Sequence, residues 1–384
     1  MNAGVLFFDM NGEKYIMEQY YYNHMTKTEQ EVYYGIMNGV TNYDTSILLP
    51  ALDIKDVQNV FFLMRLDHPE IFYVTGFKYS YYRDSPNIIF TPEYLFEKAK
   101  IKEHQKALKA RIDKLALKAK NECKTELEKE LFIHDFICEN ITYDKLKKPY
   151  SHEIIGPLGH GVGVCEGIAK SVKALCDALG IWCIIAICGN NPQKGIKYRH
   201  TWNIVKINNI YYHLDATFDN TVGRNSNHYL ELNSGSVKSV NNKNKKSEAN
   251  SLIRYDYFNL DDKAIFRDHE PLIASAPKCN DANHYYYKEK KLSFTKMDEV
   301  LNRATQAAKK GKILTFNWRG GYLTKEVLKE IVDTLKKAGE ERKKEPYISL
   351  NWSQAVIRVI YTDAVIVKEA VNIEEVNEGE NDCE

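Results

Sequence analysis

The sequence predicts an α+β protein in which a helix that carries Cys165 packs on an antiparallel sheet that carries His200 and Asp215. Three observations lead to this class. The glycine-rich stretch GHGVGVCEG precedes a helical pattern that starts at Cys165. Two strand patterns flank the pair Asn208-Asn209, as in a hairpin with a tight turn. Helical and strand patterns also alternate before residue 123 and after residue 290, which predicts an α/β extension on each side.

The composition describes a chain with a sizeable apolar core and balanced charge. Its 384 residues, 44% of them hydrophobic, suffice for two or three domains. The 53 basic and 52 acidic side chains nearly cancel, so we expect no nucleic-acid partner and no membrane partner. No window approaches the ~18 apolar residues of a membrane span, and the amino terminus has no basic region of the kind that opens a secretory signal.

The eight cysteines form no CxxC pair and no zinc-like spacing with histidine. We therefore expect neither a metal nor another cofactor. Free thiols in apolar surroundings are typical of a reducing cytoplasm. A secreted protein that has lost its signal would show the same features.

Residues 1–122 are predicted to form a mixed α/β domain. Helical spacing runs through 26–42, and a second helix from residue 53 is stopped by Pro69. Aromatic and β-branched runs on either side of residues 84–87 predict a hairpin. Residues 92–139 have the pattern of one long helix or two, the last of which enters the next domain.

Residues 123–290 are predicted to form the central domain. Its helix starts at Cys165, is capped by Gly180 and has an apolar stripe on one face. The apolar run 181–189 is typical of a central buried strand. The segments 200–207 and 210–218 form the predicted hairpin, and the polar insert at 233–251 predicts a loop.

Residues 291–384 are predicted to form a small α/β domain with an acidic tail. The run 297–320 has the pattern helix, glycine, strand. A helix follows at 324–341, and one or two strands follow at 347–368. The acidic tail begins at Glu374.

A thiol at the first turn of a helix is a candidate nucleophile. The positive end of the helix dipole lowers the pKa of such a thiol and favours thiolate. The alternative is a tight turn followed by a cysteine that packs inside as a small apolar residue. Taken alone, most cysteines are structural.

The predicted hairpin brings a histidine and an aspartate to the same end of the sheet. Counting outward from its turn pairs Thr201 with Leu214 or Asp215, so His200 and Asp215 fall near each other. A thiolate, an imidazole that moves protons and a carboxylate that fixes the imidazole tautomer are the parts of a nucleophilic site. The alternative is a surface His–Asp pair that contributes little.

Three blocks resemble the transglutaminase-like superfamily, a papain-like fold shared by transglutaminases and bacterial cysteine peptidases. GPLGHGVGVCEGIAKSVKALCDALGI is similar to the family's nucleophile block. RHTWNIVKINNIYYHLDATFDN is similar to its histidine and aspartate block, and YFNLDDKAIFRDHE to a segment that often follows in bacterial members. The resemblance covers about residues 125–290 and implies a papain-like core.

By this resemblance Cys165 is the nucleophile, His200 the general base and Asp215 the residue that orients it. The backbone N–H of Cys165 would form half of an oxyanion hole, as in other acyl-transfer sites. The other donor stays open; the candidates are Tyr143, His152 and His160.

Several positions near Cys165, His200 and Asp215 either differ from the family's pattern or lie next to these residues. Ile168 stands where many relatives have tyrosine, and Ile155 where many have an aromatic residue, which puts the substrate in doubt more than the catalysis. Trp202 is expected to pack rather than to touch substrate. Other expectations are that Glu166 complements the helix dipole, that Asp219 caps the turn after the hairpin, and that His213 is a bystander or a second polar group.

The resemblance implies a cysteine-dependent acyl-transfer enzyme that uses a Cys–His–Asp triad on amide bonds of peptides or proteins. A peptidase or amidase of bacterial type is our first expectation. One alternative is a protein-glutamine transamidase, which crosslinks proteins. The other is a non-catalytic peptide-binding scaffold that keeps the fold.

Overall fold

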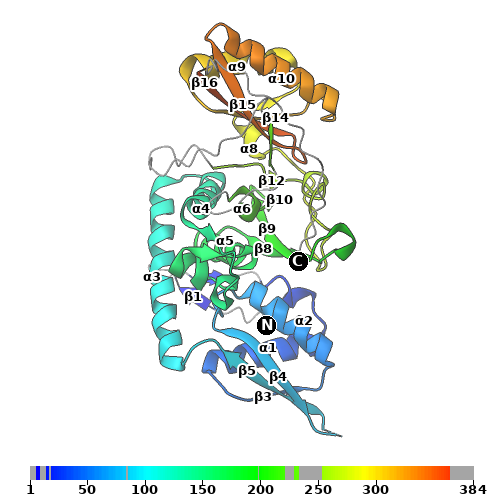
Figure 1. The fold of residues 1–384 in the computed structure, drawn as a ribbon. Helices are drawn as coiled ribbons and strands as arrows, with labels where there is room; N and C mark the ends of the chain where they lie inside the picture. The colour runs from blue at the N-terminus through cyan, green and yellow to red at the C-terminus, as the bar shows by residue number, and fades with distance from the viewer. Residues whose placement is uncertain are drawn as a thin grey trace, which may run out of the picture.

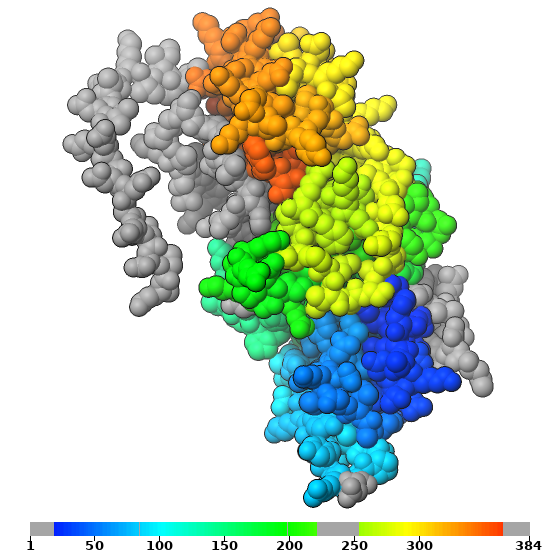
Figure 2. Space-filling model, turned by 90° about the vertical axis from the view of Figure 1, so that its right-hand side faces the viewer, coloured from blue at the N-terminus to red at the C-terminus, as the bar shows by residue number. Residues whose placement is uncertain are grey.

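The computed structural model describes residues 6–8, 14–16, 19–83, 85–197, 199–220, 229–232 and 253–363. The predicted polar insert at 233–251 and the acidic tail from Glu374 lie outside these residues. Figure 1 shows three parts stacked along one axis, with the amino-terminal part at one end and the carboxy-terminal part at the other. Figure 2 shows residues from about 255 to 280, in yellow-green, between the blue amino-terminal and the orange carboxy-terminal residues.

The amino-terminal part packs two helices against a three-stranded antiparallel sheet of order β3-β5-β4. Thr26 begins the first helix through a capping box with Glu29. Both predicted helices and the predicted hairpin, β4 with β5, are confirmed. The elements are β1 (Leu6–Phe8), β2 (Lys14–Ile16), η1 (Tyr22–His24), α1 (Lys27–Asn42), β3 (Ile47–Pro50), α2 (Ile54–Asp67), β4 (Val74–Tyr81) and β5 (Asn87–Tyr94).

Two helices connect this part to the centre. α3 (Lys98–Glu122) runs along the side of both parts in Figure 1, and α4 (Glu126–Asn140) follows after a short break. Thr125 caps α4 through a second capping box, with Glu128, which explains why the helical pattern splits in two at this point.

The central part packs α5 (Cys165–Ala178) on a four-stranded antiparallel sheet of order β12-β10-β9-β8. The side-chain amide of Asn203 in β9 (His200–Ile207) donates to the carbonyl of Ala169 in α5, 2.9 Å away. The expected stripe of α5 is buried. The other strands are β8 (Cys183–Cys188), β10 (Ile210–Leu214) and β12 (Phe258–Leu260).

Short elements surround this sheet. β6 (Thr142–Tyr143) and β7 (Val162–Gly163) pair in parallel just before α5. The remaining short segments are η2 (Pro149–His152), η3 (Ile155–His160), η4 (Pro192–Lys194), α6 (Ala216–Asp219) and α7 (Asp262–Ile265).

The register of the predicted hairpin differs from our count by one or two residues. Leu214 pairs with Asn203, and the ladder does not extend to Thr201. Asn208 and Asn209 both have positive φ, 49° and 68°, as a two-residue hairpin turn requires. Such a turn places the residue just before it opposite the residue just after it. Counting outward from that pair gives the observed register, which differs from the one we expected.

β8 is an edge strand, and the prediction of a central strand is wrong. All six of its residues are buried, which explains why its sequence resembles that of a central strand. Its free edge is covered by chain from elsewhere. The hydroxyl of Tyr21 donates to the carbonyl of Ile185 at 2.5 Å, and the N–H of Ile273 donates to the carbonyl of Ile187 at 3.0 Å.

The carboxy-terminal part packs two helices against a five-stranded sheet of order β11-β15-β16-β14-β13. The predicted succession of helix, glycine and strand is confirmed: Gly311 ends α9 with φ 61°. One or two strands are expected after the second helix, and the described residues contain two, β15 and β16. The elements are β11 (Tyr229–Leu232), α8 (Tyr286–Glu289), β13 (Ser293–Phe294), α9 (Met297–Lys310), β14 (Leu314–Trp318), α10 (Lys325–Glu340), β15 (Lys344–Asn351) and β16 (Val356–Asp363).

The predicted domain boundaries at 122/123 and 290/291 stay predictions. The residues of the hydrophobic cores can be compared with them. One core contains Val32 of α1 and Phe61 of α2 together with Ile133 of α4 and Val172 of α5, so it crosses the first boundary. The carboxy-terminal part has a core of its own, formed by residues within 294–361.

Candidate active site

Cys165 lies at the amino-terminal end of α5, as the sequence predicts, and is partly exposed. The preceding N–H, of Val164, donates to the carbonyl of Ser151 at 3.0 Å and ties the turn to η2. A Cβ on Gly167 would lie 2.2 Å from that same carbonyl, so only glycine allows the two segments to approach so closely. The glycine two residues after the cysteine is therefore needed to seat the start of the helix.

His200 and Asp215 lie within hydrogen-bond distance of each other, as predicted, although the hairpin register differs. Nε2 of His200 lies 2.6 Å from Oδ2 of Asp215. Asp215 follows β10 directly and is fully buried. Its other oxygen, Oδ1, accepts from the N–H groups of Thr217 and Phe218 at 2.8 and 2.9 Å and so caps α6. We expected Asp219 to cap this turn, but Asp215 does so.

Cys165 and His200 interact electrostatically, and each shifts the pKa of the other. Burial by itself would raise the pKa of the Cys165 thiol, but its interactions with His200, and to a lesser extent with Thr201, outweigh burial, so the pKa is lowered. Burial would lower the pKa of His200, but Asp215 and then Cys165 raise it to about 10. Despite burial, the charge of His200 holds the pKa of Asp215 well below its usual range. The arrangement favours a thiolate beside an imidazolium.

The two ring nitrogens of His200 have separate roles. Nε2 faces Asp215, so Nδ1 is the nitrogen available to the sulfur of Cys165. A carboxylate on Nε2 fixes the orientation of the ring and favours the proton on that nitrogen when the ring is neutral. Nδ1 can then take up and release a proton at the sulfur.

A second histidine, which the sequence analysis did not single out, shares the same carboxylate oxygen. Nε2 of His269 lies 2.9 Å from Oδ2 of Asp215, and its Nδ1 lies 2.8 Å from Oδ1 of Asp268. Gln354 of the carboxy-terminal part reaches both oxygens of Asp268 at 3.4 Å. A series of contacts therefore runs from His200 through Asp215, His269 and Asp268 to the carboxy-terminal part. In the sequence, the only sign of His269 was its place in the RDHE motif, at the end of the third block that is similar to the superfamily.

Trp202 and His213 form a supporting layer behind His200. The rings of His200 and Trp202 stack with centroids 5.8 Å apart. Nε1 of Trp202 donates to Nδ1 of His213 at 2.9 Å, and Nε2 of His213 lies 2.9 Å from Oδ1 of Asp262. Trp202 is buried, in agreement with the prediction that it packs. His213 is thus the second polar group rather than a bystander.

A buried network of charges lies beside the first turn of α5. Nζ of Lys170 is 2.8 Å from carboxylate oxygens of both Glu153 and Glu166. Arg65 of α2 also pairs with Glu153 and lies 3.7 Å from Glu166. Glu166 lies 3.3 Å from Nδ1 of His152. Glu166 therefore does more than complement the helix dipole: it joins the amino-terminal part to the helix that carries Cys165.

The three candidates for a second oxyanion donor differ in their surroundings. His152 is 41% exposed, and its hydrogen bond to Glu166, despite partial burial, raises its pKa, to which the charge of Cys165 also contributes. His160 is exposed and its ring lies against Tyr150, with centroids 5.0 Å apart. Tyr143 lies in β6 and is half-buried. The electrostatic interaction with the sulfur of Cys165 favours His152 as the candidate.

A second group of Cys, His and Asp lies elsewhere in the centre and differs in geometry. Nε2 of His134 lies 3.1 Å from Asp219 and 3.6 Å from the sulfur of Cys138, so one nitrogen faces both groups. All three side chains are buried, and burial raises the pKa of the Cys138 thiol. Asp219 also accepts the N–H groups of Asp256 and Tyr257. This group joins α4 to the segment before β12 and offers no accessible nucleophile.

Among the described residues, two sets of side chains have ligand atoms close enough together for a metal ion, but hydrogen bonds already occupy the histidine and aspartate atoms. They are His200, Asp215 and His269, and His213, Asp262 and Cys279. In the first set both imidazole nitrogens face one carboxylate oxygen. In the second, Trp202 donates to Nδ1 of His213, so its Nε2 carries the proton and has no lone pair for a metal.

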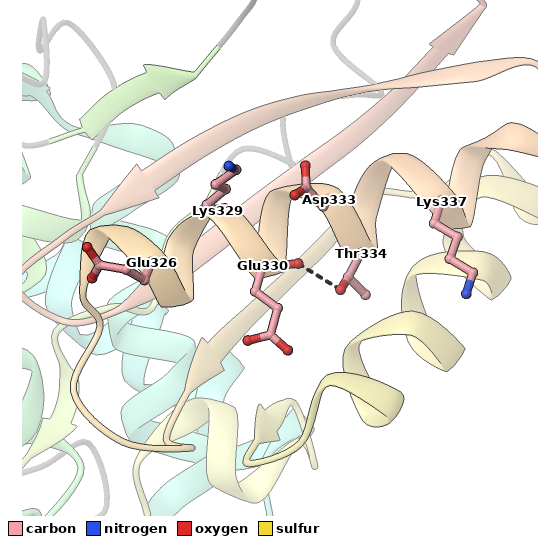
Figure 3. A pocket seen from close by; sticks show the side chains of 6 residues that line it. All are labelled: Glu326, Lys329, Glu330, Asp333, Thr334 and Lys337. Carbon is pink, nitrogen blue, oxygen red and sulfur yellow. Dashed lines mark hydrogen bonds between the residues drawn. The ribbon is translucent and has the colours of Figure 1, made fainter.

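One surface depression lies on the carboxy-terminal part. This shallow depression on α10 is lined by side chains of that one helix, and Figure 3 shows acidic and basic groups there together with one threonine. Its residues are Glu326, Lys329, Glu330, Asp333, Thr334 and Lys337.

Within the described residues, no helix combines the length and the apolar character that crossing a membrane requires.

The chain is similar to known proteins over part of its length. The model of the transglutaminase-like superfamily matches residues 113–216. No curated protein matches the sequence. Similar solved structures include a protein described as a TGase, with 13% identity over 46% of this chain and 48% of that chain and a TM-score of 0.26.

Two further solved structures are similar over part of their length. A proposed cysteine protease from Cytophaga hutchinsonii has 16% identity over 37% of this chain and 62% of that chain, with a TM-score of 0.24. A proposed protease from Parabacteroides distasonis has 14% identity over 38% and 37%, with a TM-score of 0.22. This chain thus spans less than two thirds of each of the three structures. The segment that matches the transglutaminase-like superfamily, residues 113–216, contains Cys165, His200 and Asp215.

Proposed function

We propose that the protein is a cysteine-dependent acyl-transfer enzyme that hydrolyses amide bonds in peptides or proteins. The observation that carries the proposal is a buried carboxylate, that of Asp215, 2.6 Å from the imidazole of His200, which interacts electrostatically with the partly exposed thiol of Cys165 and lowers its pKa. These are the parts that nucleophilic catalysis by cysteine requires.

In the proposed reaction the sulfur of Cys165 attacks the carbonyl carbon of the amide. The C–N bond breaks as Nδ1 of His200 gives its proton to the leaving nitrogen, and a thioester remains. His200 then takes a proton from water, whose oxygen attacks the thioester; the acid is released and the sulfur returns as thiolate. Asp215 stabilises the imidazolium through Nε2 and keeps its charge throughout.

The oxyanion that forms during attack needs donors. The N–H of Cys165 belongs to the first turn of α5, where N–H groups have no partner within the helix. We assign the second donor to His152, because its ring is held by Glu166, interacts with Cys165 and is partly exposed. An amine in place of water would make the same thioester a transamidation intermediate.

The first test measures alkylation. Iodoacetamide at mildly acidic pH, followed by mass spectrometry of peptides, should label Cys165 ahead of Cys123, Cys138, Cys176 and Cys279. Burial contributes to a raised pKa at each of these four thiols. Equal labelling would contradict an activated thiol.

The second test separates the outcomes of the thioester. Peptide libraries incubated with the protein, with and without a primary amine, should show cleavage without amine incorporation. Incorporation would favour the transamidase. Alkylation of Cys165 with neither product would favour the peptide-binding scaffold, and Cys165→Ala, which removes the nucleophile, is the control in both arms.

A further inference from the structure

His269 faces a carboxylate oxygen with each of its two ring nitrogens. Nε2 lies 2.9 Å from Oδ2 of Asp215, and Nδ1 lies 2.8 Å from Oδ1 of Asp268. The side chain is 1% exposed. An ionised carboxylate only accepts hydrogen bonds, and a neutral imidazole has a single N–H to donate. Both contacts are therefore hydrogen bonds only when the ring carries two protons and a positive charge.

Both carboxyl groups that face His269 are held in the ionised form. Burial would raise the pKa of Asp215, but His200 and then His269 hold it well below its usual range. Burial would also raise the pKa of Asp268, but the hydrogen bond and charge of His269 and the hydrogen bond of Tyr257 contribute to lowering it. The hydroxyl of Tyr257 donates to Oδ2 of Asp268 at 2.7 Å. The protons of the two contacts therefore belong to the imidazole.

The remaining groups around His269 are aromatic rings and two other imidazoles. The ring centroid of His200 lies 5.4 Å away. Burial first, and then the charge of His269 among other groups, lower the pKa of His213, although Asp262 acts in the opposite direction. Three aromatic rings have centroids 4.5, 4.9 and 5.6 Å from that of His269; they belong to Phe218, Trp202 and Tyr257. His200 is thus the imidazole that shares an oxygen of Asp215 with His269.

Two cations on one carboxylate oxygen divide its negative charge between them. In the proposed reaction His200 gives its proton to the leaving nitrogen, so the carboxylate behind it has to orient the ring without holding that proton too strongly. A nearby like charge disfavours the charged form of a group. A second imidazolium on Oδ2 of Asp215 would therefore make the proton of His200 easier to release, while it fixes the oxygen in place.

We propose that His269 is a positioning residue that acts through Asp215: as an imidazolium held between Asp268 and Asp215, it fixes the carboxylate against His200 and offsets part of its charge. The role of His269 rests on the proposed function, since it concerns the proton that His200 transfers. It also gives Asp268 a task, which is to keep the second proton on the ring.

The first measurement determines the charge of His269 directly. In histidine labelled with ¹⁵N, the two ring nitrogens of an imidazolium have similar chemical shifts, whereas those of a neutral ring differ widely. The signals of His269 are assigned by their absence from the His269→Gln protein. We expect two protonated ring nitrogens on His269 at pH 7 in the wild type. A neutral ring at that pH would overturn the proposal.

The second measurement follows the effect on His200. Alkylation of Cys165 by iodoacetamide is measured up to about pH 11, and in the wild type His200 loses its proton near pH 10. His269→Gln keeps a neutral donor for Asp215 but cannot carry the charge. We expect this step to move to higher pH by about one unit, a tenfold change in proton affinity.

The matched control is His68→Gln. His68 is also 1% exposed, and its Nδ1 lies 2.7 Å from a carboxylate oxygen of Glu70, in the amino-terminal part. An H269Q profile that superimposes on the wild type, or an equal shift in H68Q, would overturn the proposal, because a structural role alone would not move the step. If H269Q does not fold, as judged by thermal unfolding, His269→Asn carries the same comparison.

The wild-type protein separates the two levels of argument. Without preferential labelling of Cys165 the proposed function fails, whatever the charge of His269. An activated wild-type thiol together with a neutral His269, or with an unchanged H269Q profile, fails only the role of His269.

Discussion

Nε2 of His200 lies 2.6 Å from Oδ2 of Asp215, and that single oxygen also lies 2.9 Å from Nε2 of His269. Asp215 thus has two backbone donors on one oxygen and two imidazoles on the other. A carboxylate with this set of partners is held in one orientation and in its charged form. Both properties would favour the proton transfer that the proposed reaction assigns to His200.

Replacing Asp215 by asparagine should slow the reaction of Cys165. Without the negative charge the pKa of His200 falls, and the thiolate loses its cationic partner. We expect alkylation of Cys165 near pH 6 to fall by roughly tenfold or more, which mass spectrometry of the labelled peptide would measure. Asp262→Asn is the matched control, because Asp262 also binds a buried histidine, His213. An equal effect of both variants would contradict the assigned role of Asp215.

The pH dependence of alkylation should show the ion pair. The pKa of Cys165 is below its usual value, and Asp215 and Cys165 raise that of His200 to about 10. Between these values the pair is thiolate and imidazolium, so reactivity should rise below the ordinary thiol pKa and change again near pH 10. A single rise at the value of an ordinary cysteine would exclude the pair.

Loss of His269 should destabilise the fold around the site. Both its ring nitrogens face buried or half-buried carboxylates, and leucine would leave those of Asp215 and Asp268 with fewer donors. We expect His269→Leu to reduce the free energy of unfolding by about 1–3 kcal/mol in urea, and His269→Gln, which keeps a donor, to cost less. The exposed His160 is the control, since His160→Leu should change stability by about 0.5 kcal/mol or less. Similar losses at both positions would argue against these hydrogen bonds.

Arg65 should be more important for stability than an exposed cation. Its side chain is 11% exposed and pairs with Glu153, which is 1% exposed. Removal of one partner leaves a buried charge uncompensated, so Arg65→Met should cost about 3–5 kcal/mol in urea unfolding. Lys109→Met removes the exposed pair with Asp113 and should cost at most about 1 kcal/mol. A small loss in the Arg65 variant would mean that the acidic side chains find other partners.

Glu130 should make stability depend on pH between about 4.5 and about 8. Burial raises its pKa from 4.5 to about 8, although Asn259 and His134 act in the opposite direction. Its folded-state pKa lies above the unfolded one, so its contribution is complete below the lower value and is lost as pH rises through the higher one. Glu130→Gln cannot ionise, so its melting temperature should gain on the wild type between pH 5 and pH 9. A constant difference would show that Glu130 ionises freely.

The elements around the nucleophile could be predicted because their signals are local. The buried stripe of α5 and the Asn208-Asn209 turn come from spacing and from the backbone preferences of single residues. The register and the place of β8 could not be derived in this way. β8 is buried because Tyr21, 164 residues from its partner Ile185, covers its edge. No local pattern separates such a strand from a central one.

The residues behind the candidate site were missed for the same reason. His269 lies 54 residues from Asp215, and Gln354 lies 86 residues from Asp268. Their spacing relative to the hairpin has no period that a sequence pattern could detect. The second Cys–His–Asp group also contains the right residue types, and only its burial and its single shared nitrogen distinguish it from the site.

The sequence by itself determined which thiol begins a helix, which histidine starts one strand and which aspartate follows its neighbour, because helix starts, tight turns and glycine contacts depend on residues a few positions apart. Only the tertiary structure decided what surrounds them: the second imidazole on Asp215 and the charges that Arg65 brings to α5. Those contacts join segments far apart along the chain. They depend on how the sheets and helices pack rather than on the preferences of any one segment.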